Sequence, residues 1–290
     1  MKMKVGLSMF SLMRELTEDY MGTLENIAKA GYQYIEFITP PAHHGENSFP
    51  SPDEIAAKVK ELGLTPISSH CGFTAGDDLE KIADDQVKLG TPALVLPMSV
   101  MPDMEAVKDI AALCNKMGRL CKDRGVDFYY HNHAQEFLMI DGKPALYWLA
   151  ELTDPELVSF QLDTYWAARG GYDPVEVMKS LGSRCRMIHQ KDMGESADPV
   201  NLMEGVTELD PANFRQTIFA KQNPTDIVTV GTGKMDIASI VRTADELGHA
   251  HAVIVELDSV CRFNESEYDT PLSPLESVRA SREYLEDLIG

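Results

Sequence analysis

The sequence is poor in the features that mark nucleic-acid-binding and membrane proteins. Only 26 of its 290 residues are lysine or arginine, against 46 aspartates and glutamates, which gives a formal net charge of −20. Because binding to a phosphate backbone draws on clustered basic side chains, such a surface should repel nucleic acids and anionic lipids. No apolar run approaches the roughly 20 residues of a membrane-spanning helix. We therefore expect neither nucleic acid nor a membrane as a partner.

Cysteine is also scarce. The five cysteines include no C-x-x-C pair, and Cys261 is the last of them. An odd count at wide spacings indicates reduced thiols, as in the cytoplasm, and not a disulfide framework. The N-terminal stretch MKMKVGLSMF has no long apolar region and no small-residue cleavage site, so we interpret it as a first strand and not as a signal peptide. The expected compartment is the cytoplasm.

Several catalytic and cofactor motifs are missing. No G-x-G-x-x-G follows a predicted strand, which argues against an open dinucleotide-binding sheet. No G-x-S-x-G elbow is present. Gly231-Thr-Gly-Lys234 resembles the end of a phosphate loop, but Met235 stands where that motif needs Ser or Thr.

The sequence does contain short apolar runs that recur along the chain, and each run is followed by a helical pattern. Several runs are nearly continuous in Val, Ile, Leu and Phe, as is typical of parallel strands that are covered on both faces. The eight runs are VGLSMF (5–10), YIEFIT (34–39), TPISSH (65–70), PALVLPM (92–98), VDFYYH (126–131), LVSFQLD (157–163), CRMIHQ (185–190) and AVIVELD (252–258).

The segments between the runs carry helix signals. Ser51-Pro52-Asp53-Glu54 and Ser273-Pro274-Leu275-Glu276 are capping boxes with proline at the first helical position. Residues 104–122 form an amphipathic stripe. Eight strand-then-helix units predict an α/β fold, a (β/α)8 TIM barrel, as one domain over residues 1–290. An open doubly wound sheet is the alternative. A long irregular loop, 193–234, follows the seventh run and is either an active-site cover or an oligomer contact.

In such barrels the reactive groups lie at the carboxyl ends of the strands. Four ionisable residues lie at or just past the last four runs: Glu136, Asp163, His189 and Glu256. Three carboxylates and one imidazole make an oxygen-rich site that suits a divalent metal, Mn²⁺ first, with Mg²⁺, Co²⁺ or Zn²⁺ as alternatives. Each residue alone has a structural explanation, such as a helix cap or a buried ion pair. Together they favour one metal site.

Other residues near the strand ends are candidates for catalysis or substrate binding. His133 could replace Glu136 as the fifth-strand ligand, or act as a base, and this choice stays open. Lys191 could polarise a substrate oxygen or act as a base, or form a surface pair with Asp192. Four further residues are candidate substrate contacts, with core packing or backbone hydrogen bonds as the alternative: His70, His131, Trp166 and Arg169.

Over nearly its whole length the chain resembles the sugar phosphate isomerase/epimerase family of xylose isomerase-like TIM barrels. The resemblance rests on the opening VGLSMFSLMRELTEDYMGTLENIAKAGYQYIEF and on YYHNHAQEF, LDTYW, IHQKD, GTGKMD and VELD, in that order. It implies metal ligands at Glu136, Asp163, His189 and Glu256. It also implies an isomerase or epimerase of a keto sugar, in which Glu136 and Glu256 move protons through a cis-enediolate. A lyase or dehydratase acting on a keto-cyclitol or a 3-keto-glycoside is the alternative.

Two other functional classes are possible for such a barrel. An apurinic-site endonuclease shares this barrel but needs a basic face, which the net charge of −20 argues against. A non-catalytic sugar-binding barrel would bind no divalent metal. We expect a small carbohydrate as the substrate and a homo-oligomer as the assembly.

Overall fold

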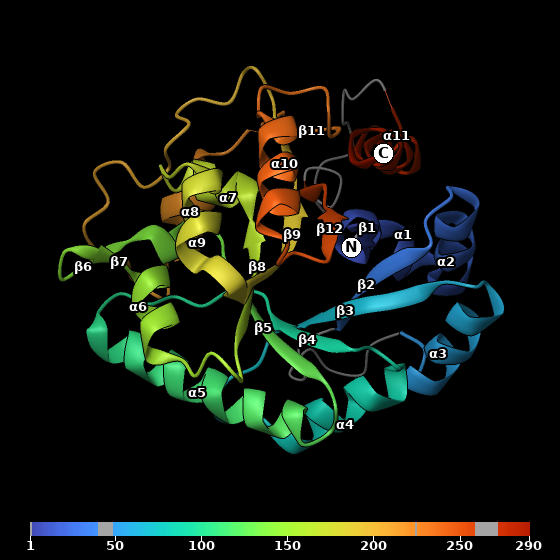
Figure 1. Ribbon diagram of the computed structural model, residues 1–290, viewed down its shortest axis with the longest axis horizontal. Coiled ribbons are helices and arrows are strands. Elements are labelled where there is room, and N and C mark those ends of the chain that lie inside the picture. Colours follow the sequence, from blue (N-terminus) through green and yellow to red (C-terminus); the bar gives the residue numbers. More distant parts are fainter. Residues whose placement is uncertain (1, 40–48, 224, 259–271) are drawn as a thin grey trace.

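The computed structural model describes residues 2–39, 49–223, 225–258 and 272–290. Eight parallel strands close into a barrel in the order β1-β12-β9-β8-β5-β4-β3-β2 (Figure 1). The strands are β1 (Lys4–Ser8), β2 (Tyr34–Thr39), β3 (Thr65–Cys71), β4 (Ala93–Leu96), β5 (Asp127–His131), β8 (Ser159–Asp163), β9 (Cys185–Gln190) and β12 (Ala252–Val255). Each strand lies in or overlaps one of the eight apolar runs, so the predicted TIM barrel is confirmed.

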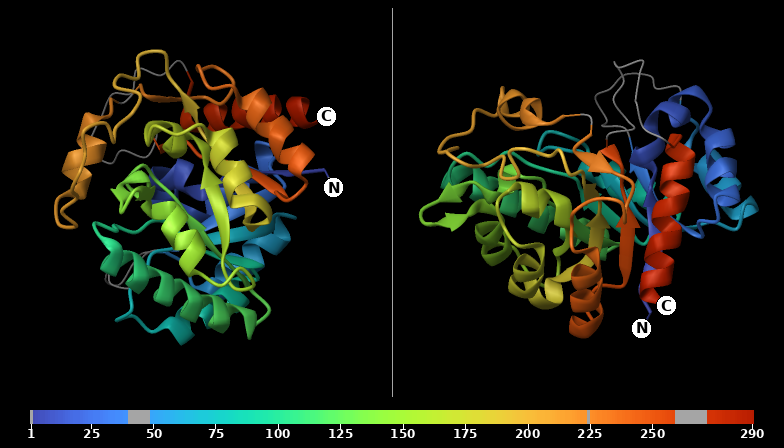
Figure 2. Two further views of the ribbon diagram at one scale, coloured as in Figure 1. Left: turned by 60° about the vertical axis from the view of Figure 1, so that its left-hand side comes forward. Right: turned by 90° about the horizontal axis from the view of Figure 1, so that it is seen from above.

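Helices surround the strands (Figures 1 and 2). The longer ones are α2 (Tyr20–Lys29), α3 (Pro52–Glu61), α4 (Leu79–Leu89), α5 (Met104–Lys122), α6 (Ala145–Leu152), α8 (Pro174–Leu181), α10 (Ile237–Leu247) and α11 (Pro274–Ile289). Short helices are η1 (Met9–Leu12), α1 (Met13–Glu18), η2 (Gln135–Phe137), α7 (Thr164–Arg169), η3 (Gly182–Arg184), α9 (Phe214–Ile218) and η4 (Phe219–Lys221). Both predicted capping boxes are present, at Ser51 and Ser273.

Strand side chains alternate between the helix-facing layer and the barrel interior. The floor of the interior is apolar: a separate buried cluster comprises Ile67, Ala93, Val95, Tyr129, Met187, Ala252 and Ile254. Two residues after three members of this cluster, at or just past the strand ends, the inward positions are His131, His189 and Glu256. Because inward-facing side chains recur at every second residue of a strand, the interior changes from an apolar floor to a polar layer at the carboxyl ends.

The excursion after β9 contains short elements of its own. β10 (Asp192–Met193) pairs antiparallel with β11 (Ile227–Val228), and α9 and η4 lie between them. A second small hairpin joins β6 (Met139–Ile140) and β7 (Lys143–Pro144). Figure 2 shows the excursion in gold and orange. Because it begins at the carboxyl end of β9, it leaves the barrel on the side where the polar layer lies.

The motif GTGKMD ties the end of this excursion back to its start at β10. The Asp192 carboxylate accepts hydrogen bonds from the backbone N–H groups of Gly231 at 2.9 Å, Gly233 at 2.8 Å, Met235 at 3.2 Å and Met193 at 2.8 Å. Several backbone donors converging on one carboxylate form an anion-binding nest, here filled by a residue of the protein itself. The motif is therefore a loop anchor in this chain.

Gly233→Ala should loosen this anchor. A Cβ at this position would lie 2.3 Å from the Met193 carbonyl oxygen and 2.5 Å from Asp192 Oδ1, so backbone would have to shift. We expect a loss of about 1–3 kcal/mol in the free energy of unfolding, measured by urea denaturation. The matched control is Gly76→Ala, where the nearest atom to a Cβ is Thr74 Oγ1 at 3.7 Å. Equal losses in the free energy of unfolding for the two substitutions would contradict the role of this loop as an anchor.

The four cysteines in the described residues are free and buried, and Cys261 lies outside the described residues. Among those residues, no helix combines the length and apolar character needed to cross a membrane.

Candidate metal centre

Four side chains at the carboxyl ends of the strands bring their ligand atoms within 4.8 Å of one another. They are His131 of β5, Asp163 of β8, His189 of β9 and Glu256, the residue after β12. All four are buried. His131 Nε2 lies 3.8 Å from Asp163 Oδ2, and His189 Nδ1 lies 3.1 Å from Glu256 Oε2. We call these four side chains the outer group.

The outer group contains an unsatisfied polar atom. His131 Nε2 is buried and has no hydrogen-bond partner among the described residues. A buried polar atom without a partner costs free energy, so such an atom in a native site points to a missing ligand. Two imidazoles and two carboxylates are the donor set of many transition-metal sites. The residues present therefore fit a divalent metal ion.

Lys191 lies against the same carboxylates. Its ammonium donates to Asp163 Oδ2 at 2.5 Å and to Glu256 Oε2, and Asp258 Oδ1 is 3.6 Å away. The side chain is fully buried. Burial alone would lower the pKa of Lys191, but the carboxylates outweigh burial and hold that pKa well above its usual value. A protonated lysine thus neutralises part of the negative charge in the metal-free protein.

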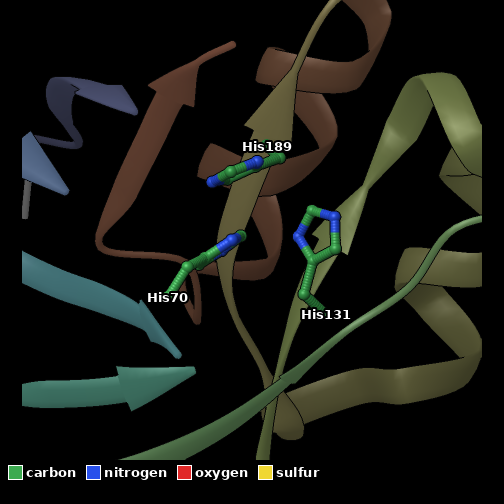
Figure 3. A group of neighbouring side chains, drawn as sticks. All are labelled: His70, His131 and His189. Carbon is green, nitrogen blue, oxygen red and sulfur yellow. The ribbon is translucent and has the colours of Figure 1, made fainter. Parts of the chain in front are cut away.

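An inner layer of hydrogen bonds supports the outer group from below. Three histidine rings from β3, β5 and β9 turn toward one another (Figure 3). The ring of His70 stacks on that of His189 with centroids 5.0 Å apart, and His131 lies 4.7 Å from His189. Glu36 and Gln161 connect the rings. Glu36 Oε1 lies 2.7 Å from His189 Nε2, and Gln161 Oε1 lies 2.9 Å from His131 Nδ1.

The charges in these layers are coupled. Burial would raise the pKa of Glu36, but His189 and His70 outweigh burial and bring it to about 2. Burial would lower the pKa of His189, but Glu36 and Glu256 raise it to about 10. Burial, together with the neighbouring side chains of His189, His70, His133 and Lys191, holds the pKa of His131 well below its usual value. In the metal-free protein His189 is therefore the charged imidazole and His131 the neutral one.

Glu136 lies outside the outer group. It belongs to η2, and its carboxylate accepts from Ser99 N at 3.1 Å, the Tyr130 hydroxyl at 2.8 Å and His133 N at 2.8 Å. Burial raises its pKa to about 7. The sequence predicts Glu136 as a metal ligand, whereas the position on β5 that faces the other three side chains of the outer group is occupied by His131.

Glu136→Gln tests which of the two residues binds metal. The amide would present a donor to one of the N–H groups that now meet the carboxylate, so we expect a stability loss of about 1–3 kcal/mol. The metal content of the purified protein should stay the same, measured by elemental analysis. His131→Ala is the comparison and should lose the metal. Loss of metal in Glu136→Gln but not in His131→Ala would support the sequence prediction instead.

Aromatic side chains lie beside the outer group. The His133 ring is 5.1 Å from that of Trp166, and Lys191 Nζ is 5.9 Å from the Trp166 ring centroid. Phe219, from η4 in the long excursion, lies 5.3 Å from Trp166 and 5.9 Å from His133. Trp166 Nε1 and His133 Nδ1 are buried without partners among the described residues. The excursion thus packs against residues next to the polar layer, as an active-site cover would.

Arg169 is fully buried and points to the excursion as well. It pairs with Asp226 at 3.0 Å, while its Nε and Nη1 have no partner among the described residues. His70, a second candidate substrate contact, belongs to the inner layer, 2.7 Å from Gln161 Oε1. The roles of Arg169, Trp166 and His133 toward a substrate remain predictions.

Glu36, Gln161 and Phe219 are not among the site residues predicted from the sequence. Gln161 lies two residues before Asp163 on the same strand, and therefore on the same face. Glu36 is a carboxylate inside the apolar run YIEFIT. Strand alternation alone could therefore have identified both Gln161 and Glu36. Phe219 lies in an irregular segment, where no periodicity indicates which side chains turn inward.

Comparison with known proteins connects this barrel to a family. A family model described as a xylose isomerase-like TIM barrel matches residues 24–288. An inosose dehydratase from Mesomycoplasma hyopneumoniae (strain J) is 38% identical over 233 residues, covering 70% of this chain and 72% of that enzyme. An inosose dehydratase from Geobacillus kaustophilus is 26% identical over 176 residues, covering 60% of this chain. This match covers 50% of the Geobacillus kaustophilus enzyme, about half of its length.

Solved structures share the fold. A sugar phosphate isomerase/epimerase from Parabacteroides distasonis superposes with a TM-score of 0.75 and 24% identity, over 99% of this chain and 94% of that one. The IOLI protein, whose crystal structure contains a bound zinc atom, gives a TM-score of 0.67 at 16% identity, over 99% of this chain and 98% of that one. At these identities the likeness concerns the fold alone.

Proposed function

Because the chain belongs to the xylose isomerase-like TIM barrel family, we propose that it is a metal-dependent lyase that removes water from a keto-cyclitol. The observation that carries the proposal is the outer group, with ligand atoms within 4.8 Å and the unpartnered nitrogen of His131 among them. The choice of a keto-cyclitol as the substrate is based on the relatives named inosose dehydratase.

The outer group would hold the cation through His131, Asp163, His189 and Glu256. Two imidazoles in place of one favour Zn²⁺, Co²⁺ or Mn²⁺ over Mg²⁺, which prefers oxygen ligands and retained waters. With Glu136 as a third carboxylate, as the sequence predicts, Mn²⁺ would come first. When bound, the cation supplies Lewis-acid polarisation of a carbonyl oxygen.

The chain's own residues supply the proton transfers that a dehydration requires. A proton leaves the carbon next to the carbonyl, its C–H electron pair forms a C=C bond, and the C–O bond to a hydroxyl on the next carbon breaks. The cluster of Glu256, Asp258 and Lys191 accepts the first proton and returns one to the departing hydroxyl, which leaves as water. Lys191 is the member that donates, because its ammonium is held protonated among carboxylates. The cluster ends in the protonation state in which it began.

An isomerase or epimerase is the second candidate. Epimerisation through the strand-five and strand-eight glutamates needs Glu136 and Glu256 on opposite faces of one substrate. In this chain the Glu136 carboxylate accepts from the N–H groups of Ser99 and His133 and the hydroxyl of Tyr130, and it is not part of the outer group. That arrangement favours the lyase.

The test is product analysis with an inosose and the zinc-, cobalt- or manganese-loaded protein in heavy water. The lyase predicts loss of water from the substrate, seen by mass spectrometry, and no turnover after chelation. An epimer that carries solvent deuterium, formed without water loss, would establish the isomerase instead. Turnover that survives complete removal of metal would overturn both assignments.

A further inference from the structure

We infer that Glu36 and Gln161 are positioning residues that set which nitrogen of each histidine in the outer group faces the metal. The inference deepens the proposed function and rests on its assignment of His131 and His189 as ligands. Its evidence is the directional pattern of hydrogen bonds across the barrel interior, from β2 to β8, β5 and β9.

The first step is the orientation of the Gln161 amide. Gln161 Nε2 lies 2.6 Å from Glu36 Oε2, which also accepts from Ser68 Oγ at 2.7 Å. A carboxylate only accepts hydrogen bonds, so the group of Gln161 that faces it must be the NH₂. The amide oxygen of Gln161 therefore points the other way, toward the histidines.

The second step is the tautomer of His131. Gln161 Oε1 lies 2.9 Å from His131 Nδ1 and 2.7 Å from His70 Nε2. An amide oxygen cannot donate, so each of these two ring nitrogens must carry the hydrogen. A histidine that binds a metal is neutral and has a single N–H. For His131 that hydrogen is on Nδ1, which leaves the lone pair on Nε2, the unpartnered atom of the outer group.

The third step applies the same reasoning to His189. Glu36 Oε1 lies 2.7 Å from His189 Nε2. Because the carboxylate accepts, the hydrogen of a metal-binding His189 is held on Nε2, and Nδ1 is the nitrogen left to bind. That atom is the one 3.1 Å from Glu256 Oε2. One buried carboxylate thus selects the ligand atom of both histidines, directly for His189 and through Gln161 for His131.

Substitutions that remove the directionality should weaken metal binding. We expect Gln161→Leu and Glu36→Gln each to lower the affinity for Zn²⁺ by about 10- to 100-fold, the range seen when partners of metal-binding histidines are removed. Affinity is measured by competition with a chelating dye. The matched control is Gln86→Leu, because Gln86 is an equally buried glutamine on α4. This control should bind Zn²⁺ like the wild type.

The exchange variant E36Q/Q161E separates positioning from packing. In it a carboxylate on β8 again accepts from His131 and His70, and an amide on β2 donates to that carboxylate and accepts from His189. We therefore expect the exchange to recover most of the affinity lost in either single variant. A purely structural role predicts losses that add up. Failure of the exchange variant to recover, with folding intact by circular dichroism, would overturn the inference.

Nitrogen-15 NMR of the metal-free wild-type protein gives a readout that needs no metal. His131 should show its hydrogen on Nδ1, and Gln161→Leu should shift the population toward Nε2. If the wild type has its hydrogen on Nε2, the inference fails even if the enzyme is active. If it has Nδ1–H but no Zn²⁺, Co²⁺ or Mn²⁺ binds, the proposed function fails and the tautomer assignment stands.

Discussion

Glu256→Gln is expected to abolish metal binding and to reduce turnover of the proposed keto-cyclitol substrate by at least about a thousandfold, because Lewis-acid stabilisation of several kcal/mol is lost. Glu256 is buried, it lies 3.1 Å from His189 Nδ1, and its second oxygen accepts from Ser8 Oγ at 3.2 Å. Burial would raise its pKa, but Lys191 and His189 outweigh burial and hold the pKa well below the usual range. The wild-type side chain is therefore an anion at neutral pH, which the amide cannot replace.

The measurements are metal content by elemental analysis and turnover by the same product assay. Glu105→Gln is the control, since Glu105 is an exposed acidic residue in the first turn of α5. It should keep both properties. A Glu256→Gln protein that retains a full equivalent of metal would show that this carboxylate is not a ligand.

Lys191→Met is expected to reduce turnover by about 10²- to 10⁴-fold, the range for loss of a proton-transferring group, without weakening metal binding. The reason lies in its partners. The ammonium contacts Asp163 Oδ2 and Glu256 Oε2, and those side chains also belong to the outer group. A cation bound there competes with the ammonium, so removing the charge should leave metal affinity unchanged or higher.

The same substitution should affect stability only when metal is absent. Without Lys191 the buried carboxylates of the metal-free protein lose their cation, and we expect a cost of about 3–5 kcal/mol. Zn²⁺ should restore most of the lost stability. The rise in Tm on adding Zn²⁺ should therefore be larger for this variant than for the wild type. Lys179→Met, at an exposed lysine of α8, is the control. Weaker metal binding in Lys191→Met would contradict this account and indicate that the lysine organises the ligands.

Strand alternation explains how much of the site could be predicted. The carboxylate of Glu256 stands out because it follows the apolar run AVIV, and His189 and Asp163 lie at the ends of their own runs. Once the barrel is predicted, the rule that strands present their carboxyl ends to one mouth brings these three together. A cluster of metal-ligating side-chain types at this mouth, with these three residues in it, can therefore be predicted from the sequence.

The fifth-strand position could not be settled in the same way. YYHNHAQEF offers His131, His133 and Glu136 within six residues, and the choice depends on where the strand ends. β5 stops at His131, after which the chain turns into η2 and directs Glu136 toward Ser99 and Tyr130. A turn of this kind follows from packing with β4 and its loop, which no local pattern of residues encodes. The hydrogen bond between Glu36 and Gln161, which are 125 residues apart in the chain, could not be predicted from the sequence for the same reason.

The most direct test of the account is a crystal structure of the zinc-loaded protein, with anomalous diffraction recorded at the zinc absorption edge. We predict one anomalous peak within about 2.0–2.2 Å of His131 Nε2, His189 Nδ1 and one oxygen each of Asp163 and Glu256. A peak coordinated by Glu136, or no peak between these four side chains in zinc-saturated crystals, would contradict it.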